Sequence, residues 1–234
     1  MAVRLPRVRI SLMLLKTADN DPFYTHVTAS FMLEARRRHP RFPLIRVLEY
    51  GVCLHDMRAD DRAYLDKIEA SGRRNVHKAR RLGYRFQPIA YNDWLGDIAA
   101  IRRSTTVRQG PMPESLLQDK AAPCQNPPSR CATHDYRYFG VVKDGALVAY
   151  AGVLVAGELA MIEHILGHAE HQANGVVPLL LIGMEDVIRR EHPQSCYYGY
   201  GTWFGASESL RRFKKKFLFL PHRVRWIGGR KGGA

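Results

Sequence analysis

Residues 136–166 constrain the fold of this chain more than any other stretch. Three runs rich in β-branched and aromatic residues follow one another there, with connections of two or three residues between them. Short connections that contain glycine are typical of tight hairpin turns. The sequence therefore predicts a meander of three antiparallel strands. The strands are predicted at residues 136–143, 147–156 and 159–166, with turns at Asp144-Gly145 and Gly157-Glu158.

Helices and further strands are predicted on both sides of this meander. Apolar residues recur at helical spacing in several segments, and they alternate or cluster as in strands in others. The helices are predicted at residues 31–38, 64–79 (capped by Asp60 or Asp61), 94–101, 176–190 and 210–217. The strands are predicted at residues 44–54, 84–90 and 196–200, and residues 4–16 are interpreted as a strand or as an arm lying on a neighbouring element.

Length and composition indicate one globular domain with an extension. The chain has 234 residues, and 46% of them are hydrophobic, which is enough to bury a full core. We find no internal repeat and no inter-domain linker. The predicted organisation is an N-terminal extension packed on the core (1–55), a main domain (56–228) and a flexible tail (229–234).

The charge balance indicates an anionic partner. There are 36 Lys and Arg against 22 Asp and Glu, which gives a formal net charge of +14. Such an excess favours RNA, a nucleotide cofactor, an acidic carrier protein or an anionic membrane as a partner. The net charge narrows the class of binding partner, but it does not indicate which reaction, if any, the protein catalyses.

The cysteines and the N-terminal segment predict a cytoplasmic protein. Four cysteines are too sparse for a disulfide scaffold, so we expect them to be reduced. The apolar run at residues 12–15 is too short for a signal peptide core or for a transmembrane segment. The proline-rich residues 109–133 are predicted to form a long loop that serves as a lid or as a wall of a binding site.

Two groups of residues resemble metal ligands, and we expect neither to bind a metal. One group lies in the long loop, and the other surrounds a turn after the third meander strand. Neither shows the paired Cys-x-x-Cys spacing of a zinc site. The groups are Cys124, Cys131 and His134, and His164, His168 and His171.

Three motifs carry a resemblance to a known superfamily. They are Arg-Arg-Asn-Val-His-Lys-Ala at residues 73–79, the meander from Gly145 to Gly167, and Ser-Leu-x-x-Phe-Lys-x-x-Phe-x-Phe-x-Pro at residues 209–221. Together with the order of elements, they resemble the GNAT acyltransferases, in particular the Fem-type aminoacyl transferases and their single-domain acetyltransferase-like relatives. The resemblance implies a GNAT-like α/β (α+β) fold, with a mixed, mostly antiparallel central sheet flanked by helices.

The resemblance also implies an activity, which is transfer of an acyl group to an amine. The donor would be acyl-CoA, an acyl carrier protein or an aminoacyl-tRNA, used as a co-substrate, and no cofactor would be bound permanently. The pair Phe213-Lys214 matches a Phe-Lys pair of the family, whose lysine is thought to stabilise charge during transfer. The alternative without a catalytic role is that Lys214 belongs to an exposed run of three lysines at residues 214–216.

The donor-binding residues match the family less completely. The glycine loop that cradles a pyrophosphate in CoA-dependent relatives corresponds to residues 172–177, which contain one glycine where the pattern has two. Gln172, Asn174 and Gly175 are the candidates there, and Phe213 is added from the closing motif. Arg73, Arg74 and Lys78 form either a phosphate-binding strip or an ordinary solvated helix face. The chain also lacks room for a second GNAT module, so the cell-wall substrate of the two-domain members is not carried over.

Acyl transfer to an amine requires a base, an acid and groups that polarise the carbonyl. Glu163 and His164 are candidate bases, and strand alternation would let only one of them face the cleft; we prefer Glu163. Tyr198 and Tyr200 are candidate acids, although such tyrosines are more often core residues. The alternative function is a non-catalytic module of the same fold that binds RNA or another anionic partner. The residues assigned to the substrate cleft are Trp203, Phe204 and Ser207.

Overall fold

The computed structural model describes residues 4–13, 23, 27–40, 42–59, 62–107, 112–126 and 128–228. The predicted cap at Asp60 or Asp61 and the predicted tail 229–234 lie outside these residues. No helix within them is long and apolar enough to cross a membrane.

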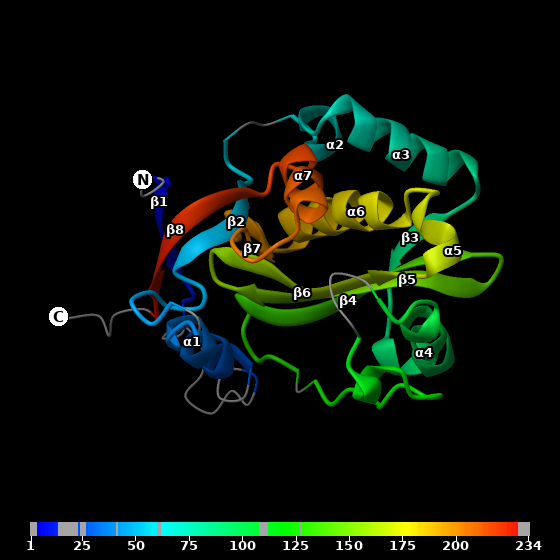
Figure 1. The fold of residues 1–234 in the computed structure, drawn as a ribbon, viewed down its shortest axis with the longest axis horizontal. Coiled ribbons are helices and arrows are strands. Elements are labelled where there is room, and N and C mark those ends of the chain that lie inside the picture. The colour runs from blue at the N-terminus through cyan, green and yellow to red at the C-terminus, as the bar shows by residue number, and fades with distance from the viewer. Residues whose placement is uncertain are drawn as a thin grey trace.

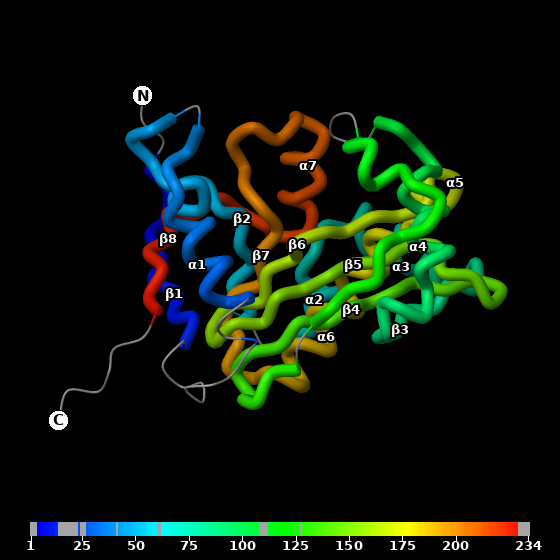
Figure 2. Tube along the Cα trace, turned by 90° about the horizontal axis from the view of Figure 1, so that it is seen from below, coloured from blue at the N-terminus to red at the C-terminus, as the bar shows by residue number. Residues whose placement is uncertain are grey.

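A single mixed sheet organises the described residues, with the strand order β1-β8-β2-β7-β6-β5-β4-β3. Figure 2 shows the strands following this order from β1 and β8 on the left to β3 on the right. The predicted meander is confirmed as β4, β5 and β6, which pair in antiparallel fashion. The strands are β1 (Arg7–Ser11), β2 (Tyr50–Asp56), β3 (Arg85–Pro88), β4 (His134–Lys143), β5 (Ala146–Ala156), β6 (Leu159–Gly167), β7 (Tyr197–Thr202) and β8 (Leu220–Ile227).

Helices cover both faces of the sheet (Figure 1). Helices α2, α3, α6 and α7 lie over one face, and α1 and α4 lie over the other. Because α6 is apolar nearly all round, it packs between the sheet and the outer helix α3. The helices are α1 (Ala29–Arg36), α2 (Tyr64–Lys67), α3 (Ala70–Arg81), α4 (Leu95–Arg103), α5 (Ala169–Gln172), α6 (Val176–Glu191) and α7 (Glu208–Lys216), with 3₁₀ turns at Tyr91–Trp94 and Glu114–Leu116.

The single helix predicted at residues 64–79 is wrong, because the chain breaks between α2 and α3. Ile68 is extended, with ψ of 162°. The Arg73 guanidinium donates hydrogen bonds to the carbonyl oxygens of Asp66 (3.2 Å) and Ile68 (2.6 Å). The Glu69 N–H donates to the Lys216 carbonyl at 3.1 Å. The carbonyls and amide freed by the break are therefore satisfied by other partners.

The strand predicted at residues 44–54 begins only at Tyr50. Residues 37–47 fold back on themselves instead, with Pro40 and Pro43 near the turn, where proline is compatible with the backbone. Both β1 and β2 belong to the same sheet as the meander, and β1 runs parallel to β8. The first 56 residues thus supply two strands of the sheet.

The parallel strands β6 and β7 separate part of the way along their length. They pair only at Leu159–Tyr197, Ala160–Tyr198 and Met161–Gly199. Strand β6 continues to Gly167, and no further pairing with β7 occurs in the described residues. The sheet is therefore split at this point, and β6 and β7 do not satisfy each other's backbone groups beyond it.

Candidate functional site

A cavity of about 800 Å³ lies at the split between β6 and β7. The end of β6, the first turn of α6 and single residues from α3, β7 and α7 form its wall. Residues of the loop that follows α4 close one side. The lining residues are Asn75, Thr105, Val107, Met112, Ile165, Leu166, Gly167, Ala169, Gln172, Val177, Pro178, Tyr200 and Phe213.

Three of the residues predicted from the sequence meet in this cavity: Gln172, Tyr200 and Phe213. The Gln172 amide donates a hydrogen bond to the Gly167 carbonyl at 3.3 Å, so it also ties α5 to the end of β6. Asn75 lines the cavity and was not predicted, although it lies within the Arg-Arg-Asn motif. Its place in that motif was the signal that could have found it.

Gly175 sets the start of α6 beside the cavity. It adopts a φ of 83°, and a Cβ atom at this position would lie 2.3 Å from the Asn75 carbonyl oxygen. Only glycine tolerates both the conformation and the contact. The Val176 and Val177 amides follow it at the helix start, where amides lack partners within the helix, and Pro178 supplies no amide.

Other predicted donor-binding residues hold the protein together instead. Lys78 Nζ donates to the Ala173 carbonyl at 2.9 Å, and Asn174 Nδ2 donates to the Tyr84 hydroxyl at 3.0 Å. The Arg73 guanidinium donates hydrogen bonds to carbonyl oxygens at the break between α2 and α3. Arg74 is exposed on α3. The basic helix is therefore partly committed to intramolecular hydrogen bonds.

Glu163 and His164 lie on the same face of the sheet, because β6 contains a bulge between the Gly152–His164 and Val153–Ile162 pairs. The Tyr136 hydroxyl donates to the Glu163 carboxylate at 2.8 Å. A Cβ atom on Gly152 would meet both the His164 ring (2.3 Å) and the Tyr136 hydroxyl (2.8 Å). The alternation expected from a regular strand therefore fails here.

The environment makes Glu163 a stronger base than an ordinary glutamate. The side chain of Glu163 keeps an exposed face, but the protein atoms around its carboxylate raise its pKa, and the hydrogen bond from Tyr136 partly offsets this rise. Glu163 follows Met161, the last residue of β6 that pairs with β7, by two positions, and it precedes the cavity residue Ile165 by two. Its backbone therefore stands where the sheet opens, but Glu163 does not line the cavity, and its carboxylate is directed towards Tyr136 of β4.

His164 belongs to a polar and aromatic cluster on the α4 face of the sheet. Burial is the larger cause, and the positive charge of Arg102 the smaller cause, of a pKa of His164 lowered to about 4. The imidazole is therefore neutral at physiological pH. The Arg102 guanidinium donates to the hydroxyls of Tyr150 (2.9 Å) and Tyr91 (3.0 Å). The His164 ring lies 5.4 Å from the Tyr150 ring, centroid to centroid.

Lys214 is buried in the core between α7 and the sheet, with 3% of its surface exposed. Its ammonium donates to the Thr202 carbonyl at 2.7 Å and lies 5.0 Å from the centre of the Tyr200 ring. Burial lowers the pKa of Lys214, and the neighbouring Cys53 opposes this effect. The alternative of an exposed charge run is therefore wrong for Lys214, which reaches a cavity residue, Tyr200, but does not itself line the cavity.

The two candidate tyrosines have different environments. Tyr200 lines the cavity, and burial raises its pKa to about 12, so its hydroxyl remains a proton donor at neutral pH. Tyr198 is fully buried, and its hydroxyl donates to the Leu181 carbonyl at 3.4 Å. The structure thus brings Tyr200 to the cavity and leaves Tyr198 in the core.

The residues assigned to the substrate cleft lie outside the main cavity. The backbone N–H of Trp203 donates a hydrogen bond to the Gly51 carbonyl at 2.7 Å. The Phe204 ring stacks on the Tyr50 ring, with ring centres 5.4 Å apart. The Ser207 hydroxyl accepts a hydrogen bond from the Leu210 N–H at 3.3 Å and caps α7. These residues fix the turn from β7 to α7.

One set of potential metal ligands comes together near the cavity. The ligand atoms of His168, Glu170 and His171 all lie within 4.8 Å of one another, at or beside α5. His171 Nδ1 is also hydrogen-bonded to the Tyr84 hydroxyl at 2.7 Å. His164 does not belong to this group of three and lies in the α4 cluster, beside Tyr150.

The potential ligands in the long loop do not form one group. Cys131 Sγ lies 2.9 Å from His134 Nδ1, whereas Cys124 Sγ contacts the Tyr138 hydroxyl at 3.1 Å. These two cysteines are therefore directed to different partners.

Comparisons with known proteins agree with this architecture. No protein-family model matches the sequence, and no curated protein gives a significant match. Among solved structures, FemX is similar with a TM-score of 0.52 and 12% identity, over 74% of this chain and 59% of that chain. The C-terminal domain of a protein assigned as a lysylphosphatidylglycerol synthetase, from Agrobacterium fabrum, is similar with a TM-score of 0.50 and 17% identity, over 74% and 58%.

A tandem GNAT protein from the clavulanic acid biosynthesis pathway is also similar, with a TM-score of 0.47 and 14% identity over 88% of this chain and 58% of that chain. This chain therefore spans about three fifths of the length of the solved structures that it resembles. At these identities, the similarity concerns the fold. The split mixed sheet, the helices on both its faces and the similarity to FemX and to the synthetase domain show that the chain has the GNAT-like α/β fold.

Proposed function

We propose that this protein is an N-acyltransferase that moves an acyl or aminoacyl group from an activated donor to an amine. The observation that carries the proposal is the cavity at the split between β6 and β7, with Glu163 at the start of the split. A donor chain that enters this gap would run between strand segments that do not pair with each other. The fold places no such gap elsewhere between neighbouring strands of the meander, which pair along their lengths.

The residues around the split suggest a division of roles. The neutral acceptor amine bonds through its nitrogen to the donor carbonyl carbon, and Glu163 takes the proton that this nitrogen loses as the bond forms. The carbon–sulfur bond of a thioester, or the ester carbon–oxygen bond of an aminoacyl-tRNA, breaks. Tyr200 then gives a proton to the departing thiolate or ribose oxygen. The positive charge of Lys214, next to the Tyr200 ring, favours the phenolate that this step forms.

The start of α6 would bind the phosphate groups of the donor. The amides of Val176 and Val177 would bind a phosphate at the start of α6, whereas Pro178 contributes none. This is a smaller cradle than two glycines and a full helix turn would provide. The experiment below therefore includes all three donor classes: acyl-CoA, an acyl carrier protein and an aminoacyl-tRNA.

The experiment is a donor panel. Purified protein is incubated with labelled acetyl-CoA, long-chain acyl-CoA, acylated carrier protein and charged tRNA, each with a mixture of primary amines. We expect amine-dependent discharge of one donor class and formation of an amide. Glu163→Gln should bind the same donor but discharge it slowly. If no donor is discharged and RNA is bound tightly in a salt-dependent manner, the protein is instead a binding module.

A further inference from the structure

The described residues of segment 37–47, between α1 and β2, form a hairpin. The Val47 N–H donates to the Arg37 carbonyl (2.9 Å), and the His39 N–H donates to the Ile45 carbonyl (3.0 Å). Arg38 and Arg46 form a β-bridge at its base. We refer to these residues as the 37–47 hairpin, of which residue 41 lies outside the described part of the chain.

The tip of the 37–47 hairpin exposes two large apolar side chains. Leu44 is 99% exposed, and Phe42 is 59% exposed. A leucine at this exposure contributes nothing to the core, and its transfer from water to an apolar phase is favourable. Clustered exposed apolar residues of this kind mark contact surfaces.

An apolar pocket of about 230 Å³ adjoins one side of the 37–47 hairpin. Phe42, Ile45 and Val47 line it from the hairpin, and Tyr50 and Phe204 line it from the sheet and from the turn after β7. Phe204 is itself 39% exposed. The apolar surface therefore extends from the tip of the hairpin towards the end of β7.

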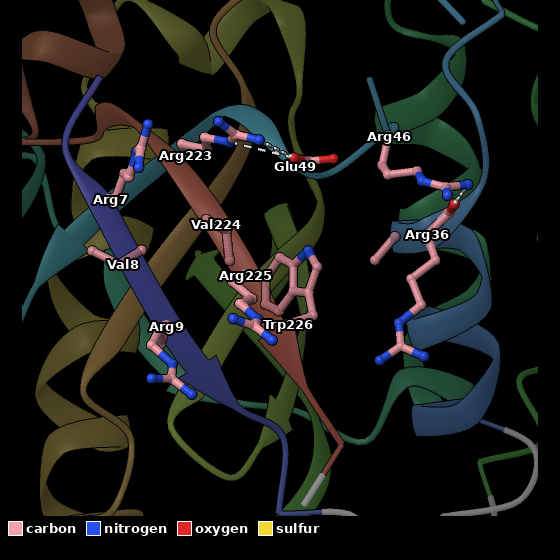
Figure 3. A pocket seen from close by; sticks show the side chains of 11 residues that line it. Arg7, Val8, Arg9, Arg36, Arg46, Glu49, Arg223, Val224, Arg225 and Trp226 are labelled. Carbon is pink, nitrogen blue, oxygen red and sulfur yellow. Dashed lines mark hydrogen bonds and ion pairs between the residues drawn. The ribbon is translucent and has the colours of Figure 1, made fainter. Parts of the chain in front are cut away.

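An arginine-rich groove of about 650 Å³ adjoins the other side (Figure 3). Figure 3 shows arginines of β1 and β8 along one side of it and Arg36 and Arg46 opposite them. Glu49, the acidic residue in its wall, pairs with Arg223 at 2.9 Å. The arginines that line the groove are Arg7, Arg9, Arg36, Arg46, Arg223 and Arg225.

The arrangement of these arginines calls for an anionic partner. Arg7 pairs in register with Arg223, and Arg9 pairs with Arg225, so like charges lie directly opposite each other on neighbouring strands. Like charges at such positions repel each other. Among the described residues, Glu49 offsets Arg223, whereas no acidic side chain forms an ion pair with Arg7, Arg9 or Arg225. Charged residues also protect edge strands from aggregation, which would explain β1. That role does not explain β8, which lies inside the sheet, or Arg36, which lies on a helix.

We propose that the 37–47 hairpin and the arginine-rich groove dock this protein on a bilayer that contains anionic phospholipid. Phe42 and Leu44 enter the interfacial region, and the arginines contact lipid phosphates. Basic residues are attracted to such a surface, and apolar insertion adds to this attraction. An RNA backbone would fit the arginines, but it offers nothing to an exposed leucine or to an apolar pocket.

Vesicle co-sedimentation tests this proposal with matched variants. The probes are vesicles of phosphatidylcholine alone and of phosphatidylcholine mixed with phosphatidylglycerol. The apolar variant is Leu44→Ser, and its control is Leu82→Ser, another exposed leucine, 39% exposed, on the opposite part of the molecule after α3. The charge variant is R9Q/R36Q, and its control is R80Q/R81Q, which removes two exposed arginines from α3. Circular dichroism checks that each variant is folded.

The expected result is binding to the mixed vesicles and little binding to phosphatidylcholine. R9Q/R36Q should lower the partition coefficient about 30-fold, and Leu44→Ser should lower it about tenfold, while both controls stay at the wild-type value. Absence of vesicle binding by the wild-type protein would overturn the proposal, as would equal losses in the variants and their controls. RNA binding that depends on Arg9 and Arg36, without vesicle binding, would assign the groove to nucleic acid and would equally overturn it.

Discussion

At the scale of single residues, Glu163 carries the proposed chemistry. Replacing it with glutamine keeps the size of the side chain and the hydrogen bond with Tyr136, but removes the base. We expect Glu163→Gln to lower the rate of acyl transfer about 10²–10⁴-fold with an unchanged unfolding midpoint. Steady-state kinetics measures the first quantity and urea denaturation the second. A rate within twofold of the wild type would exclude Glu163 as the base.

The pH dependence of the rate tests the role of Tyr136 as a positioning residue. Glu163 acts as a base only when deprotonated, so the rate should fall as the pH drops through its pKa. The protein atoms around the carboxylate raise that pKa, and the Tyr136 hydrogen bond lowers it. Tyr136→Phe removes the lowering contribution, so we expect the acid limb of the pH–rate profile to move to higher pH. Tyr138→Phe, which lacks a hydrogen bond to Glu163, serves as the control, and an unmoved limb in Tyr136→Phe would contradict this role.

Lys214 should affect stability as well as activity, because it is buried and bonded. Lys214→Ala leaves the Thr202 carbonyl without its 2.7 Å donor. We expect the free energy of unfolding to fall by about 1–3 kcal/mol in urea denaturation. Lys215→Ala, at the exposed neighbouring position, should leave it within about 0.5 kcal/mol of the wild type. Equal stabilities of the two variants would show that the Lys214 contact contributes nothing.

At the scale of elements, the start of α6 depends on the contact between Gly175 and α3. Gly175 and Gly83 both have a positive φ, but a Cβ atom would collide with Asn75 only at Gly175. Gly83→Ala should cost about 1–2 kcal/mol of unfolding free energy from backbone strain alone. Gly175→Ala should cost clearly more, because α6 must also move away from α3. Thermal or urea denaturation compares them, and a smaller loss in Gly175→Ala would refute this packing.

Local sequence patterns predicted the elements whose stability is local. The meander follows from alternation and two-residue turns, and α6 and α7 follow from their apolar spacing. The break at Ile68 could not be predicted, because it depends on Arg73 and on the distant Lys216 carbonyl. The bulge in β6 was missed for a similar reason, since nothing in the order of Glu163 and His164 signals an extra residue in the strand.

At the scale of the whole molecule, the resemblance predicted the fold, and the split sheet confirms it. The candidate site was predicted only in part. Gln172, Tyr200 and Phe213 meet in the cavity, because each lies on an element that borders the split. Tyr198 and Asn174 could not be separated from them by sequence, since their burial and partners depend on α6 and on Tyr84. The exposed tip of the 37–47 hairpin was likewise hidden by a pattern that resembles a strand.

The central claim is that the donor occupies the cavity at the split, and a matched pair of tryptophan substitutions tests it most directly. Ala169 is exposed and lines the cavity, whereas Ala173, also exposed, does not line it. The measurement is the rate of discharge of the preferred donor. Ala169→Trp should reduce this rate at least tenfold by filling the cavity, and Ala173→Trp should retain it. Equal rates for the two variants would contradict donor binding in the split.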